Sequence, residues 1–224
     1  MIALPKVLRP RVGLLVTAAV VLALTGCGPV KAGSAATVGD ESLPETTVAT
    51  TSEEIDTVVA EAGVELAIPP TEVNLNIVAS WVDQQLTQSL AAAEGITVTA
   101  GEVDRFLERY DDKARVDITA QLAIPPSQLE QAAETLLLKQ KVAQSLVPDG
   151  SPDKQGAALQ KALGAAADDL GVSVNPRFGA WDACASGGTN GAPCVPGVVP
   201  TAEDRLSSPV QSDAPVESLP PAVP

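Results

Sequence analysis

The sequence predicts a mainly α-helical fold, a bundle of about five amphipathic helices with a short strand near each end. Hydrophobic residues make up 45% of the 224 residues but aromatic residues only 2%, so the apolar content comes from Ala, Val and Leu. Ala and Leu are among the best helix formers. Apolar residues also recur at helical spacing in several segments that begin and end with typical helix-terminal residues. We therefore expect a helical core built from small side chains.

The first elements are a strand and a helix. Residues 36–43, Ala-Thr-Val-Gly-Asp-Glu-Ser-Leu, predict a short strand or hairpin with its turn at Gly39 and Asp40. Thr51 and Glu54 have the spacing of a capping box, which predicts that the first helix starts there and ends at Gly63. Its expected buried face consists of Ile55, Val58, Val59 and Ala62.

Two Pro-Pro pairs open long helical patterns. Pro69 and Pro70 precede a periodic segment that runs to Gly95, and Pro125 and Pro126 precede one that runs to Val147. The surrounding octapeptides, 66–73 and 122–129, are similar, whereas their flanks differ. We interpret the similarity as convergent helix-start chemistry rather than as a true repeat.

Three further elements complete the pattern. A second capping box at Thr99 and Glu102 predicts a helix over 99–114. After a Pro- and Gly-containing break at 148–152, apolar periodicity predicts a last helix that ends at Gly171. Residues 172–181 then predict a strand that is interrupted at Asn175 and Pro176.

The N-terminus predicts export. Lys6, Arg9 and Arg11 precede an almost wholly apolar run from Val12 to Leu24, which is the charge order and length of a secretory signal peptide. Residues 24–27, Leu-Thr-Gly-Cys, resemble the lipobox of bacterial lipoproteins. The resemblance implies cleavage after residue 26, palmitate-type acylation of Cys27, and a lipid anchor at the extracytoplasmic face of the cell membrane. The alternative is an ordinary cleaved signal that leaves Cys27 as a free thiol.

Two further cysteines favour a structural disulfide. With Cys27 acylated, Cys184 and Cys194 remain as an even pair in an exported protein. The segment between them is rich in Gly and able to turn back on itself. Their spacing matches neither a zinc site nor a CxxC redox pair, so we expect a disulfide and no metal.

The charge balance limits the classes of partner. Removing residues 1–26 removes three basic residues and no acidic one, which leaves 11 basic and 28 acidic residues and a net charge of −17. Nucleic acid and anionic lipid are poor partners for such a surface. The acidity fits either a preference for basic clients or simple solubility outside the cell.

Three segments together resemble the N-terminal domain of the SurA family of extracytoplasmic chaperones and foldases, and more closely actinobacterial lipoproteins that carry this domain. They are the Val-Gly-Asp strand at 36–43, the helix junction Gly-Ile-Thr-Val-Thr-x-x-Glu-Val-Asp at 95–104, and the closing strand around Asn-Pro-Arg-Phe-Gly-x-Trp-Asp at 175–182. The resemblance implies that the first and last strands pair as a two-stranded sheet. It also implies a helical groove that holds unfolded chains.

The chain departs from that family in one respect. SurA-type foldases insert parvulin prolyl isomerase domains at the place that residues 147–153 occupy here, and parvulin sites commonly use His, which this chain lacks. The resemblance therefore implies no isomerase activity. The expected organisation is a signal peptide (1–26), a lipid-anchored tether (27–35), the SurA-like helical domain (36–184), and a disulfide loop with a disordered Pro-rich tail (185–224).

Candidate site residues are few. The absence of His removes the common nucleophilic sites and His-ligated zinc, so we expect no enzyme, no cofactor and no small-molecule substrate. The acid pairs Asp111-Asp112 and Asp168-Asp169 are formally possible hydrolase carboxylates, but solvated surface charge explains them. The aromatic candidates for a client groove are Trp81, Phe106 and Tyr110, although core packing is the favoured interpretation of Trp81.

These observations lead to one functional hypothesis and two alternatives. The first is a lipid-anchored, extracytoplasmic chaperone-like module that binds unfolded or extended segments of exported proteins. The second is an adaptor lipoprotein of the same fold, docked on one envelope partner. The third is an acid-pair hydrolase, which needs two carboxylates that face each other in a cleft.

Overall fold

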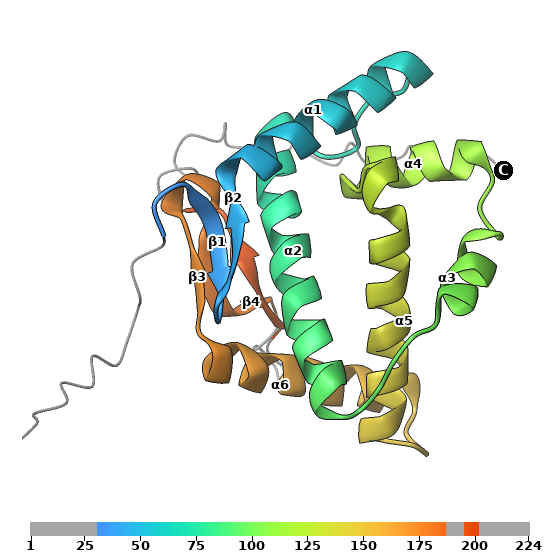
Figure 1. Ribbon diagram of the computed structural model, residues 1–224, viewed down its shortest axis with the longest axis vertical. Helices are drawn as coiled ribbons and strands as arrows, with labels where there is room; N and C mark the ends of the chain where they lie inside the picture. Colours follow the sequence, from blue (N-terminus) through green and yellow to red (C-terminus); the bar gives the residue numbers. More distant parts are fainter. Residues whose placement is uncertain (1–30, 187–194, 202–224) are drawn as a thin grey trace, which may run out of the picture.

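The computed structural model describes residues 31–186 and 195–201, and within them the protein is mainly helical, as predicted (Figure 1). The signal peptide, Cys27 and Cys194 lie outside the described residues. In chain order the elements are β1 (Ser34–Val38), β2 (Glu41–Pro44), α1 (Glu45–Ala62), α2 (Pro70–Ala93), α3 (Ala100–Leu107), α4 (Asp112–Leu122), the 3-10 turn η1 (Pro126–Gln128), α5 (Leu129–Leu146), α6 (Pro152–Leu170), β3 (Val172–Val174), the 3-10 turn η2 (Pro176–Phe178), β4 (Ala180–Ser186) and β5 (Val195–Val199).

The N-terminal and C-terminal strands pair, as the family resemblance implied. β1 lies between β2 and β3 in a three-stranded antiparallel sheet, with Ala36 opposite Val174 and Val38 opposite Val172. The third strand is present because residues 36–43 fold as a hairpin. Gly39 has a φ of +58° at the first position of the two-residue turn, a conformation that glycine adopts without strain.

A second sheet corrects the predicted tail. Residues 195–199 form β5, which pairs antiparallel with β4, so the prediction of a disordered tail from residue 195 onward is wrong for this segment. Pro196 and Gly197 are unfavourable in strands, so the sequence did not predict one here, but Val198 is buried in the core. Residues 202–224 lie outside the described part.

The first helix begins earlier than predicted. α1 starts at Glu45, directly after β2, so the predicted capping box at Thr51 and Glu54 is wrong. Thr51 is buried within the helix, and the Glu54 carboxylate instead accepts hydrogen bonds from the Ser127 backbone N–H (3.1 Å) and hydroxyl (2.6 Å). The other predicted capping box, at Thr99 and Glu102, is confirmed at the start of α3.

The predicted helix over 99–114 is two helices. α3 ends at Leu107, and α4 begins after Asp111, whose side chain caps it by accepting a hydrogen bond from the Ala114 N–H at 2.8 Å. Periodicity alone did not separate the two helices, because the helical spacing of the apolar residues continues unbroken from α3 into α4. The described part therefore contains six α-helices where about five were expected.

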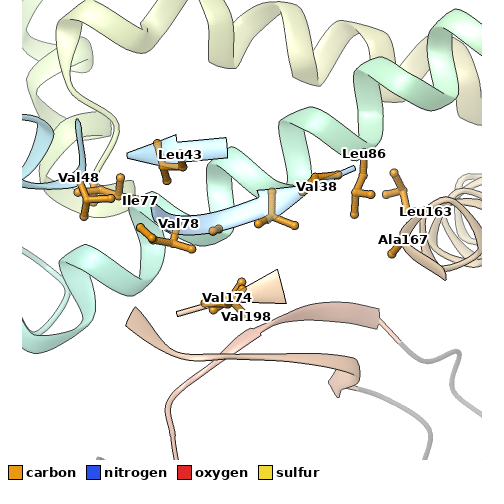
Figure 2. Packing of buried hydrophobic residues seen from close by; sticks show 14 of the residues in the cluster. Val38, Leu43, Val48, Ile77, Val78, Leu86, Leu163, Ala167, Val174 and Val198 are labelled. Carbon is orange, nitrogen blue, oxygen red and sulfur yellow. The ribbon is translucent and has the colours of Figure 1, made fainter. Parts of the chain in front are cut away.

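The core gathers around α2. Figure 2 shows Leu86 of α2 facing Leu163 and Ala167 of α6, with Val174 of β3 and Val198 of β5 close to each other. Ala35, Ala36 and Val38 of β1 are buried in the same cluster, where small side chains allow the strand to approach the helices closely. The sheet and the helices thus share one core.

Gly179, between η2 and β4, occupies a position that other residues do not fit. Its φ is +128°, and a Cβ there would lie 2.8 Å from the Val199 carbonyl oxygen and 2.8 Å from Val198 Cγ1 of β5. Both the conformation and the close approach of β5 require glycine.

We expect Gly179→Ala to lower the free energy of unfolding by about 2–4 kcal/mol, because backbone strain and overpacking add. Urea unfolding followed by circular dichroism measures the change. Gly164→Ala is the matched control, because no atom lies within 4 Å of a Cβ in the middle of α6. We expect the control to gain about 0.5–1 kcal/mol, and equal effects of the two changes would contradict this account of Gly179.

Candidate functional site

A groove of about 580 Å³ opens between the helices and is the candidate site. Five helices contribute side chains to it, together with the end of β2 and η1. α2 and α5 run side by side along it, and α3 and α4 lie on the α5 side of the molecule (Figure 1). Most of the exposed lining is apolar, and the volume falls in the range of ordinary ligand sites.

Two helical stripes face the groove. α2 contributes Ile77, Ser80, Trp81 and Gln84, and α5 contributes Leu129, Ala132, Ala133 and Leu136. Both sets have the spacing i, i+3, i+4, i+7, so each is one face of a helix. The local sequence therefore places these residues, while the packing of α2 beside α5 brings the two faces together.

The three aromatic residues selected from the sequence line this one groove. Trp81 comes from α2, Phe106 from α3, and Tyr110 from the segment between α3 and α4. The rings of Phe106 and Tyr110 are 5.6 Å apart, and the Arg109 guanidinium lies 4.3 Å from the centre of the Phe106 ring, a cation–π contact. Trp81 is half-buried and also packs against the core, so both interpretations of this residue apply.

Two leucines of the groove are unusually exposed. Leu122 of α4 is 55% exposed and Leu136 of α5 is 42% exposed, and among the described residues Leu170 at 36% is the one other large hydrophobic side chain in this class. The helical periodicity of the segment from Pro126 to Val147 predicts Leu136 on the buried side of its helix, and its exposure shows that this prediction is wrong. Its helical spacing is the same as that of core residues, so the sequence carried no signal that distinguished it.

The charged residues and the buried threonines of the groove are satisfied within the protein. Lys139 of α5 and Asp83 of α2 form an ion pair at 2.5 Å, and these two are the charged residues in the described lining. The Gln128 amide donates a hydrogen bond to the Thr51 hydroxyl at 3.2 Å. The groove therefore has no net charge from its own lining.

A polar contact joins the start of α3 to α5. The Lys141 ammonium lies 2.8 Å from the Glu102 carboxylate and donates a hydrogen bond to the Thr97 carbonyl at 2.8 Å. The hydrogen bond from Lys141, followed by those from the Thr99 backbone and hydroxyl, lowers the pKa of Glu102 to about 2. These contacts hold in place the helix that carries Phe106.

The remaining candidates lie apart from the groove. Asp111 and Asp112 are exposed at the start of α4, and Asp168 and Asp169 are exposed at the end of α6. In the part of the chain that the structure describes, no cluster of three metal-ligating side chains occurs, and no helix is both long and apolar enough to span a membrane. Cys184 is disulfide-bonded, but Cys194 lies outside the described residues, so the pairing of the two stays a prediction.

Comparisons with protein-family models, with curated proteins and with solved structures found no match to this chain. The groove and the sequence features are therefore the basis for a functional assignment.

The Glu102 contact predicts a specific pH dependence. A carboxylate whose pKa is lower in the folded chain stabilises the fold while it is ionised. Its contribution is complete above the unfolded pKa of about 4.5 and is lost as the pH falls towards 2. We expect wild type and Glu102→Gln to differ most in urea unfolding at pH 5 and above, and to converge as the pH approaches 2.

Glu108→Gln is the control, because the Glu108 side chain makes no ion pair or hydrogen bond within the described residues. The difference in the free energy of unfolding between Glu108→Gln and wild type should vary less over the same pH range. A constant difference between wild type and Glu102→Gln from pH 5 to pH 2 would contradict the assigned role of the contact.

Proposed function

We propose that this protein is a lipid-anchored, extracytoplasmic chaperone-like module that holds unfolded or extended segments of exported proteins in the groove between α2 and α5. The observation that carries the proposal is the groove itself. It combines apolar helical faces, three aromatic side chains and two exposed leucines. Exposed apolar side chains gathered in one concavity are typical of a binding surface.

The physical character of the groove suits varied clients. Its lining is mainly apolar, and its two charged residues neutralise each other in an ion pair. Affinity would therefore come mainly from burial of client side chains. Binding also costs the entropy of ordering a flexible segment. The expected complexes are therefore weak and tolerant of client sequence, as a module that releases its clients requires.

Two features support a relationship to the N-terminal domain of the SurA family. β1 and β3 pair, as the family resemblance implied for the first and last strands. The connection between α5 and α6 spans only residues 147–151, at the place where SurA-type foldases insert their isomerase domains. We accordingly propose a related lipoprotein that binds clients without isomerising prolyl bonds.

The groove leucines provide the test of client binding. We expect the mature full-length chain to slow the aggregation of a chemically unfolded exported protein, measured by light scattering at several-fold excess. Leu122→Gln and Leu136→Gln should each reduce this effect several-fold, because each replaces apolar contact surface with a polar amide.

Leu170→Gln is the matched control, since Leu170 is an exposed leucine outside the groove lining. It should retain wild-type activity. No protection by the wild-type chain would overturn the proposal, and co-purification of one stoichiometric partner in place of many clients would favour the adaptor alternative.

The lipid anchor is tested separately. We expect the precursor, expressed in a bacterium that acylates lipoproteins, to carry lipid on Cys27 and to enter the detergent phase in Triton X-114 partitioning. Cys27→Ser should move the chain to the aqueous phase, whereas the control Cys194→Ser should not. A wild-type chain without lipid, identified by mass spectrometry of its N-terminal peptide, would contradict this anchor.

A further inference from the structure

Gln84 is an unpartnered amide inside the groove. It lies on the α2 face that also carries Ile77 and Trp81, and only 8% of it is exposed. Its side chain makes no hydrogen bond to any described residue. Every fully buried side-chain nitrogen or oxygen in the described part does have a partner. The two amide atoms of Gln84 must therefore reach accessible space, and the groove that Gln84 lines provides it.

Gln84 is the one buried polar side chain of the described groove lining that has no hydrogen-bond partner. The Thr51 hydroxyl accepts a hydrogen bond from the Gln128 amide at 3.2 Å, and the Thr135 hydroxyl donates to the Gln131 carbonyl at 2.9 Å. An amide that is mostly enclosed by apolar side chains and bonds to no protein group adds less to folding stability than a leucine, which would bury more apolar surface at this position. A polar group kept in such a place is better explained by a bound ligand than by folding.

The charges of the groove indicate which ligand fits. Lys139 is neutralised by Asp83, so the described lining offers no free cation to receive a carboxylate or phosphate headgroup. The mature chain, at a net charge of −17 once the three basic residues of the signal are removed, also repels anions. A neutral carboxamide, with one donor group and one acceptor, instead complements a peptide group.

We infer that Gln84 binds the main chain of an extended polypeptide in the groove: its Nε2 donates to a peptide carbonyl oxygen, and its Oε1 accepts a hydrogen bond from a peptide N–H. This inference rests on the proposed function and names how the client is recognised. Because every peptide group presents the same donor and acceptor, recognition by Gln84 is independent of client side chains. Gln84 then orients the chain, while the apolar faces of α2 and α5 receive its side chains.

The experiment uses the mature full-length chain and two neutral probes. One is a fluorescent, uncharged peptide of about ten residues rich in Val and Leu, and the other is the apolar dye N-phenyl-1-naphthylamine. We expect Gln84→Leu to weaken peptide binding about 5- to 10-fold, the effect of one or two neutral hydrogen bonds. Dye binding should be unchanged or tighter, because the groove becomes more apolar.

Gln85→Leu is the matched control, since Gln85 is the next residue of α2 and does not line the groove. It should leave both affinities unchanged. A series of peptides in which single amides are replaced by esters tests the contact directly. One ester position should weaken binding to wild type several-fold and cause no further loss with Gln84→Leu.

The outcomes separate the two claims. If neither peptide nor unfolded client binds wild type, the proposed function fails and this inference fails with it. If the peptide binds wild type and Gln84→Leu equally, or if no ester position matters, only the role of Gln84 is overturned. Circular dichroism verifies folding, and Gln84→Met replaces Gln84→Leu if the latter does not fold.

Discussion

The antiparallel pairing of β1 with β3 is the interaction on which the rest of the structure depends. It joins the beginning of the described chain to the segment after the last helix, and the Asn175 N–H adds a hydrogen bond to the Ala35 carbonyl at 2.8 Å. Glu45, the first residue of α1, accepts hydrogen bonds from Asn175 Nδ2 (3.0 Å) and from Arg177 (3.0 Å). The segment that directly follows β3 therefore holds α1, one wall of the groove, at its N-terminus.

The groove lies where two helical hairpins meet. α1 packs on α4 and α2 on α5, and the Ala67 N–H, in the connection between α1 and α2, donates a hydrogen bond to the Ala120 carbonyl of α4 at 2.9 Å. In the connection between α4 and η1, Ala123 has a φ of +52°, and the Thr119 hydroxyl stabilises the turn by donating a hydrogen bond to the Ile124 carbonyl at 2.8 Å. Side chains from all four of these helices line the groove, so its shape is set by this stacking.

Local chemistry made much of the fold predictable. The capping box at Thr99 and Glu102 and the proline start of α2 are found where the sequence placed them, because caps and fixed φ values act over a few residues. The interruption at Asn175 and Pro176 is present as η2 between β3 and β4. For the site, three of the five aromatic residues, Trp81, Phe106 and Tyr110, were candidates from their positions in predicted helices, and all three line one groove.

The sequence by itself determined the helical class, most helix ends and the aromatic candidates, since propensity, capping and periodicity are local properties. Only the tertiary structure decided that Glu54 bonds Ser127 instead of capping a helix, that residues 195–199 join the core, and that Leu136 faces a groove. Each of these depends on a partner distant in the chain. An apolar helical stripe has the same spacing whether a neighbouring helix covers it or leaves it open.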